Sequence, residues 1–208
     1  FGVIFKQQGG EIPYLSYLLA GMVLFRVISG GLGMNTCLMD NYDLMGHSVF
    51  PRELIPLSKA AGVSLELAVT IPSVIIIGAL QGITPSITLL ALPLVVLSVL
   101  LLAAALTIVA STVQVFVRDL QFFIGFAITA LFFASPISYE EDQLPDWLRW
   151  LNTVNPISVD IDALRDVALR GQWPDWPLFG LHLVLAALLL VGAIAHLRAV
   201  SHRIVDLG

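Results

Sequence analysis

The chain has 208 residues, of which 58% are hydrophobic and only 12% are charged, and its mean hydropathy is +0.91. Soluble domains carry about 25% charged residues, so this composition excludes an ordinary soluble protein and predicts a membrane protein. The formal net charge of -5 argues against nucleic-acid binding, which needs a basic surface. The one cysteine, Cys37, excludes an internal disulfide and a cysteine-based zinc site.

The chain begins in an apolar stretch, Phe1–Phe5, with no initiator methionine and no basic region before it. We expect an earlier helix to end near Phe5, so that the natural N-terminus is missing from this sequence. Residues 1–208 are then interpreted as a single transmembrane domain.

Long runs with almost no charged residue predict the membrane spans. In chain order they are Tyr14–Asn35, Leu67–Val117, Leu120–Tyr139 and Trp176–Leu197. The second run is far longer than the roughly 20 residues that one span needs. Turn-forming residues at 81–85 divide it into two spans, the first expected to begin near Ala60. The runs do not alternate as barrel strands would, so the prediction is an all-α bundle with about five complete spans.

The Lys and Arg residues of short loops predict the orientation of the bundle. One side holds Arg52, Lys59, Arg118, Arg198 and Arg203, and the other holds Lys6, Arg149, Arg165 and Arg170. The first side is therefore expected to be cytoplasmic. The acidic residues assigned to the outer side are Glu11, Glu140, Glu141, Asp142, Asp146, Asp160, Asp162, Asp166 and Asp175. We expect an acidic outer surface.

The long outer segment after residue 139 carries or borders all four tryptophans, which favour the headgroup zone of a membrane. Apolar residues recur there at helical spacing: Leu144, Trp147, Leu148, Leu151 and Val154. This pattern predicts an amphipathic helix in the outer leaflet. A small folded cap above the membrane would explain the same stripe.

Motifs for chemistry within the chain are weak. A phosphate-binding loop places a lysine directly after a glycine pattern, and neither Lys6 nor Lys59 lies in one. Gly31-Leu32-Gly33 ends an apolar helix, so close helix packing explains it better than dinucleotide binding. His182 and His196 are too far apart to share a metal, and we expect interfacial roles for both. We therefore predict no catalytic residue, no metal site and no cofactor bound by this chain.

Arg26 falls inside a predicted span, where a charge is costly and should face protein or water. Two interpretations compete. Arg26 either faces a conduit as a cation for an anionic substrate, or forms a structural ion pair with Glu66 of the next span, which we favour slightly.

The connection between the first two spans carries Leu38, Met39, Tyr42 and Met45 at helical spacing. The pattern predicts a short amphipathic helix along the membrane, ended by Gly46. This helix either anchors the fold or docks onto a cytoplasmic partner.

At this connection the sequence resembles the membrane subunits of bacterial ABC exporters for O-antigen, capsular polysaccharide and teichoic acid. The matching segments, which cover nearly the whole chain, are Pro13-Tyr14, Leu19-Ala20-Gly21, Phe50-Pro51-Arg52-Glu53, Pro56-Leu57-Ser58, Val115-Phe116-Val117-Arg118-Asp119-Leu120, Ser135-Pro136-Ile137-Ser138-Tyr139 and Asn155-Pro156 with Arg165 downstream. The chain departs from the pattern at Gly46-His47-Ser48, where a basic residue is common, and at Phe25, where a tryptophan is common.

The resemblance implies a six-helix half-transporter of the bacterial inner membrane that forms a homodimer and binds two cytoplasmic ATPase subunits, which hold ATP and Mg. By comparison with that family, we expect the N-terminal interfacial helix and most of the first span to be missing from this sequence. The resemblance places the coupling to the ATPase at Asp40, Tyr42, Asp43, Leu44, Phe50, Pro51, Arg52, Glu53, Arg118 and Asp119. Membrane lipids would surround a channel for a lipid-linked glycan. Candidates for its lining are Phe25, Arg26, Phe116, Phe122, Phe126, Phe133 and Tyr139.

Other functions stay open at this stage. An ABC permease could carry another amphipathic lipid or a drug-like substrate. A carrier driven by an ion gradient would need ionisable residues near mid-membrane, and only Arg26 and Glu66 qualify. A membrane glycosyltransferase would use the outer carboxylates.

Overall fold

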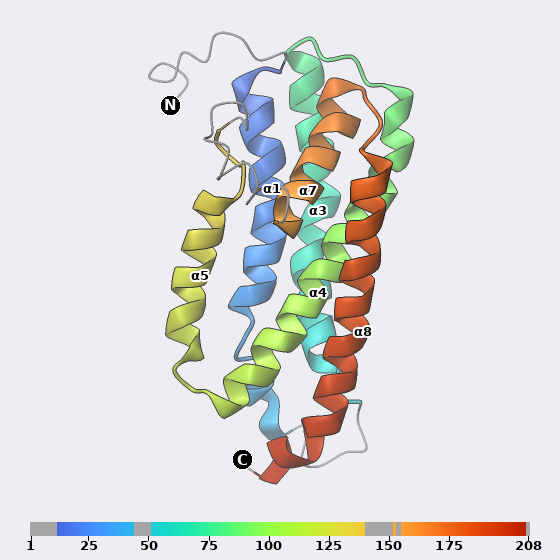
Figure 1. Ribbon diagram of the computed structural model, residues 1–208. Coiled ribbons are helices and arrows are strands. Elements are labelled where there is room, and N and C mark those ends of the chain that lie inside the picture. Colours follow the sequence, from blue (N-terminus) through green and yellow to red (C-terminus); the bar gives the residue numbers. More distant parts are fainter. Residues whose placement is uncertain (1–11, 44–50, 140–151, 153–154, 207–208) are drawn as a thin grey trace. The chain divides into compact units, whose positions relative to one another are not determined.

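A computed structural model describes residues 12–43, 51–139, 152 and 155–206, and every element in these ranges is helical. In chain order the elements are α1 (Tyr14–Gly33), the 3-10 helix η1 (Met39–Asn41), α3 (Leu54–Leu80), the 3-10 helix η2 (Ile87–Ala91), α4 (Leu92–Phe116), α5 (Leu120–Ala134), α7 (Pro156–Arg165), the π-helical turn η4 (Asp166–Arg170) and α8 (Trp176–Asp206) (Figure 1). The predicted all-α fold is confirmed.

Within the described residues, four helical segments are long and apolar enough to cross a membrane: Tyr14–Gly33, Leu54–Leu80, Ile87–Phe116 and Trp176–Ser201. The fifth expected span is shorter than predicted, because α5 has 15 residues and so measures only about 22 Å, against a hydrocarbon core of about 30 Å. The helix ends before Ser135-Pro136, since proline has no N–H to donate and disfavours helical geometry in the residue before it.

The break predicted at residues 81–85 is confirmed between α3 and η2. Gly82 has a positive φ of 93°, and the N–H of Ile83 donates to the carbonyl of Gly78 at 3.0 Å, which closes the turn. α3 begins at Leu54 rather than near Ala60. Pro56 is compatible with this earlier start, because the first-turn N–H groups of a helix have no partner within it.

The chain divides into two compact units. Unit 1 comprises Phe1–Arg26, Leu67–Leu97 and Leu131–His182, and unit 2 comprises Val27–Glu66, Ser98–Ala130 and Leu183–Gly208. Each of α1, α3, α4, α5 and α8 has one part in each unit, and successive long helices pass between the units in opposite directions. The described basic residues Arg52, Lys59, Arg118 and Arg198 fall in unit 2, whereas Arg165 and Arg170 fall in unit 1.

Unit 2 contains an apolar core contributed by α3, α4, α8 and the connection after α1. Its buried members are Cys37, Leu38, Ile55, Ile108, Val115, Ala193 and Leu197. Close helix packing at Gly31 is also confirmed, because a Cβ there would lie 2.7 Å from Oγ1 of Thr107 and 3.2 Å from the carbonyl oxygen of Ala103. A Cβ at Gly33 would meet nothing within 4 Å. Only the first of the two glycines is therefore required for packing.

Unit 1 is organised around α7 and η4. The apolar side chains of Ile157, Ile161 and Leu164 are buried on one stripe of α7, at the spacing of an amphipathic helix. Oγ1 of Thr88 in η2 donates to the carbonyl of Val167 in η4 at 2.8 Å. These contacts fix α7 and η4 within the unit and so position the residues described next.

Candidate functional site

The centre of the candidate site in unit 1 is the side chain of Arg165, which is fully buried at the end of α7. Its Nη2 donates to the carbonyl of Tyr17 at 3.2 Å and to that of Ile137 at 3.1 Å. The guanidinium carbon lies 3.4 Å from the centre of the Tyr17 ring, and Nη1 is 3.5 Å from Oδ1 of Asp162. A buried cation needs such partners to offset the cost of leaving water.

Asn155 holds the other end of α7. Its Oδ1 caps the helix by accepting the N–H of Ile157 at 3.1 Å, and Pro156 follows at the first helical position, where its missing N–H costs nothing. The Asn155 Nδ2 donates to Oγ of Ser135 at 3.0 Å and to the carbonyl of Ala134 at 3.3 Å. The two motifs Ser135-Pro136 and Asn155-Pro156, separate in the sequence, therefore meet.

Tyrosine hydroxyls extend this network. The hydroxyl of Tyr17 donates to the carbonyl of Tyr139 at 2.7 Å, and that of Tyr139 donates to the carbonyl of Phe133 at 3.1 Å. A Cβ at Gly21 would lie 3.0 Å from Cα of Ile137 and 3.1 Å from Nη2 of Arg165. We call the set Tyr17, Gly21, Ser135, Ile137, Asn155 and Arg165 the Arg165 latch. The latch joins α1, the turn after α5, and α7.

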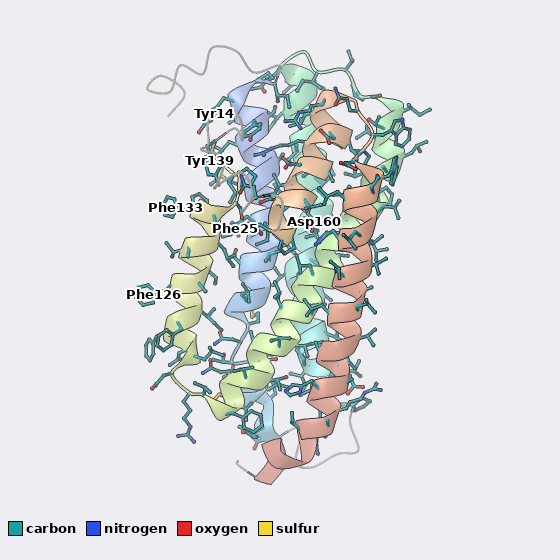
Figure 2. All side chains as sticks on the ribbon, viewed as in Figure 1. Tyr14, Phe25, Phe126, Phe133, Tyr139 and Asp160 are labelled. Atoms are coloured by element: carbon teal, nitrogen blue, oxygen red, sulfur yellow. The ribbon has the colours of Figure 1, made fainter. Side chains whose placement is uncertain are left out.

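A second buried polar pair lies in the same unit. Nε2 of His182 in α8 is 3.2 Å from Oδ2 of Asp160 in α7, and Figure 2 labels Asp160 on its helix. Both side chains are buried, which corrects the expectation that Asp160 belongs to the acidic outer surface, whereas the interfacial role expected of His182 stays a prediction. The spacing of α7 contained the signal, because Asp160 and Arg165 fall on the same stripe as Ile157, Ile161 and Leu164.

In unit 2 the predicted coupling residues Arg52 and Glu53 are anchored to α8. Nε of Arg198 donates to Oε1 of Glu53 at 2.8 Å, and Nη1 of Arg52 donates to the carbonyl of Ser201. A hydrogen bond from its own backbone N–H, and then the Arg198 guanidinium, lower the pKa of Glu53 below its ordinary value. The carboxylate is therefore ionised at neutral pH.

The other coupling candidates occupy two further places in unit 2. Arg118 and Asp119 are exposed in the turn between α4 and α5. Gln114 fixes that turn, since its Nε2 donates to the carbonyl of Arg118 at 2.7 Å while its Oε1 accepts from Asn35. Pro51 is exposed before α3.

The predicted amphipathic helix after α1 lies partly outside the described residues. Only η1 and the helical residues Tyr42 and Asp43 are described, with Asp40 exposed and accepting from Thr36 at 2.9 Å. Leu44, Met45 and Phe50 lie outside the described residues. Beside η1, a groove of about 570 Å³ is lined by Asn41, Leu54, Ile55, Leu57, Ser58, Lys59 and Ala61. The segment therefore contributes to a concave surface as well as to the core of unit 2.

The channel candidates differ in exposure. Figure 2 shows Phe126 and Phe133 projecting from the same side of α5, and both are more than two-thirds exposed, at 76% and 71%. Phe116 and Phe122 are also exposed. Phe25 is instead partly buried, with its ring centre 5.4 Å from that of Phe132. The exposed rings are free for lipid, a second copy or a substrate.

The proposed Arg26–Glu66 ion pair stays a prediction. Arg26 is exposed in unit 1 and Glu66 is partly exposed in unit 2, and neither residue is without an interaction. The predicted outer helix at Leu144, Trp147, Leu148, Leu151 and Val154 lies outside the described residues.

Comparisons with known proteins agree with the resemblance drawn from the motifs. The family model described as ABC-2 type transporter matches residues 1–169. The chain is 29% identical over 164 residues to two O-antigen export system permease proteins RfbA of Klebsiella pneumoniae, covering 77% of this chain and 63% of each relative. It is 25% identical over 193 residues to the RfbA permease of Myxococcus xanthus, covering 91% of this chain and 74% of that relative. The chain thus aligns with less than two-thirds of the length of the Klebsiella proteins. The four apolar helices and this family match identify a multi-pass membrane protein.

Proposed function

Because the chain belongs to the ABC-2 type transporter family, we propose that it is the membrane subunit of an ATP-driven exporter. Its substrate is a lipid-linked polysaccharide of the O-antigen class, carried outward across the bacterial inner membrane. The observation that carries this proposal is the similarity to O-antigen export permeases along 77% of the chain. In this function the chain supplies the conduit, and a separate ATP-binding subunit supplies the energy.

Unit 2 supports the docking of that subunit. It contains the described basic residues of the predicted cytoplasmic side, exposes Arg118 and Asp119, and has the groove beside η1. We place the ATPase contact on this surface. Arg52 and Glu53 both bond to α8. A movement of the segment that carries them would therefore be transmitted directly to this long apolar helix.

The complex is proposed to contain two copies of this chain and two ATP-binding subunits. The exposed phenylalanines of α5 support this arrangement, because large exposed rings are suited to an apolar interface, lipid, or stacking against sugar rings. ATP binding would draw the two ATPases together, move the docking segments, and tilt the spans so that the glycan passes.

Copurification tests the proposal. We expect an ATP-binding subunit encoded next to this chain to copurify with it in detergent, and the complex to restore surface glycan in cells that lack both proteins. Arg118→Glu should weaken the association and leave the thermal unfolding temperature unchanged, because the side chain is exposed. Export by this chain without any ATP-binding subunit would contradict the proposal and would favour a gradient-driven carrier.

A further inference from the structure

Two segments of unit 2 that carry predicted coupling residues are joined by buried hydrogen bonds. Nδ2 of Asn35, in the connection after α1, donates to Oε1 of Gln114 at 2.7 Å, although 79 residues separate the two. Nε2 of Gln114 donates in turn to the carbonyl of Arg118 at 2.7 Å. We call these two bonds the Gln114 link. They connect the segment after α1 to the turn between α4 and α5.

The amide of Gln114 suits this place because one planar group offers both a donor and an acceptor. The carbonyl of Arg118 can only accept, so it takes Nε2 and leaves Oε1 to Asn35. Asn35 and Gln114 are only 5% and 1% exposed. Water cannot readily replace either partner, and breaking one bond would leave a buried polar atom unpaired, which is costly. The link therefore resists separation of the two segments.

Contacts next to Asn35 extend the link to η1. Oγ1 of Thr36 donates to Oδ2 of Asp40 at 2.9 Å, which ties the residue after Asn35 to the 3-10 helix. Cys37 and Val115, the residue after the glutamine, both belong to the apolar core of unit 2. Polar and apolar contacts together thus fix the start of the connection to the end of α4.

Both ends of the link lead to exposed residues. Asp40 in η1 is exposed, as are Arg118 and Asp119 in the turn between α4 and α5. All three are predicted coupling residues. A partner that displaces η1 would therefore displace the turn as well, because the buried bonds between them are costly to break.

We propose that Gln114 is a positioning residue for transport, which makes η1 and the turn at Arg118 and Asp119 move as one body when the ATP-binding subunit docks. Gln114 is buried, so it acts through Asn35 and Arg118 rather than by meeting the ATPase itself. Its role in export rests on the proposed function, whereas the connection of the two segments does not. Without the link each segment would follow the ATPase separately, and part of the movement would not reach α4 and α5.

The first test follows amide hydrogen exchange in the intact chain in lipid nanodiscs. Asn35→Leu removes the donor to Oε1 and leaves the bond from Gln114 to Arg118 possible. We expect exchange of the amides at 117–120 to become about two- to tenfold faster, the range that one lost hydrogen bond gives. Unchanged exchange at these amides would show that the connection after α1 does not hold the turn, and would overturn the inference.

Thr112→Val is the matched control. Thr112 is as buried as Gln114 and lies in the same helix, but its Oγ1 donates within that helix, to the carbonyl of Ile108 at 2.7 Å. The variant keeps the shape of the side chain and loses one buried hydrogen bond. It should leave exchange at 117–120 as it is in the unmodified chain.

The second test measures glycan export per ATP hydrolysed, in the complex reconstituted with the ATP-binding subunit. Gln114→Met keeps the approximate length of the side chain and loses both hydrogen bonds. We expect this ratio to fall at least about threefold, while the ATP-binding subunit copurifies in the same proportion, because the exposed docking residues are unchanged. Thr112→Val should keep the ratio of the unmodified chain. If Gln114→Met does not assemble, Asn35→Leu is measured in its place.

The double variant Asn35→Leu with Gln114→Met separates a shared link from two independent losses of stability. It should reduce the ratio no further than Gln114→Met alone, because both substitutions act on one contact. Additive losses, or an equal loss in Thr112→Val, would show that general stability sets the ratio and would overturn the positioning role.

The unmodified complex separates this inference from the proposed function. If it exports glycan and Gln114→Met exports as much per ATP, only the positioning role is wrong. If it exports nothing with its ATP-binding subunit, the proposed function falls, and the exchange measurement on the chain alone still decides whether the two segments are connected.

Discussion

The guanidinium of Arg165 lies 3.4 Å over the ring of Tyr17, although 148 residues separate the two in the sequence. The same Nη2 donates to carbonyls on α1 and on the turn after α5. One side chain thus fixes three segments of unit 1. A lysine carries the same charge but lacks the planar fork that makes these contacts together.

We expect Arg165→Gln to lower the free energy of unfolding by about 3–5 kcal/mol, the usual result of removing one partner from a buried ionic contact. Arg165→Lys should recover less than half of the loss. Thermal unfolding in detergent, followed by intrinsic fluorescence, measures both effects.

Arg170→Gln is the matched control for that experiment. Arg170 pairs with Asp166 on the neighbouring turn but is partly exposed, and exposed pairs contribute only about 0–1 kcal/mol. Equal losses for the two arginine variants would show that the latch has no special role.

Two neighbouring glycines give a second prediction. Gly31→Ala should destabilise the chain by about 1–3 kcal/mol, since its Cβ would overlap Thr107 and crowd the carbonyl of Ala103. Gly33→Ala should be neutral or stabilising by up to about 1 kcal/mol, since open space surrounds that position. The unfolding temperatures of the two variants, measured in one detergent, test this difference. A Gly31→Ala protein as stable as the unmodified chain would contradict the close packing.

The ion pair between Glu53 and Arg198 yields a third prediction, for coupling. In the reconstituted complex, Glu53→Arg should reduce severalfold the stimulation of ATP hydrolysis by this chain, because the variant places two cations side by side where α3 meets α8. The double variant Glu53→Arg with Arg198→Glu should restore most of it. Failure of the double variant to recover would assign Glu53 to another partner.

The same pair predicts a pH dependence. The pKa of Glu53 is lowered in the folded protein, so the stability from its ionised carboxylate is present above the unfolded-state pKa and is lost as pH falls through the folded value. The difference in unfolding temperature between the unmodified chain and Glu53→Gln should be constant from about pH 6 to 8. It should vanish in acid, and a difference that persists there would exclude the charge as its cause.

A fifth prediction concerns Asn155, which both caps α7 and bridges to Ser135. Asn155→Ala should cost more than the roughly 1 kcal/mol of a helix cap alone, because it also removes the link to the turn after α5. Asn155→Asp keeps the oxygen that caps α7 but loses the Nδ2 donor that reaches Ser135. Its stability should therefore fall between that of the unmodified chain and that of Asn155→Ala. An Asn155→Asp variant as stable as the unmodified chain would show that the bridge to Ser135 contributes nothing to stability.

Local patterns were enough to predict much of this molecule. The apolar runs predicted the long helices because each span must pair its own backbone, and the Gly-Pro cluster at 81–85 predicted the break between α3 and α4. The apolar run at 120–139 overestimated the length of α5, because Ser135-Pro136 follows its last residue and stops the helix. The stripe from Leu38 to Met45 is described only as far as Asp43, so the helix predicted beyond that residue stays a prediction.

The sequence by itself determined which segments form helices apolar and long enough to cross a membrane, because hydropathy is a property of each residue and its neighbours. Only the tertiary structure decided that Asp160 meets His182, that Arg165 is buried against Tyr17, and that Asn155 reaches Ser135. These contacts join segments distant in the chain, and their energies depend on packing that no local pattern records.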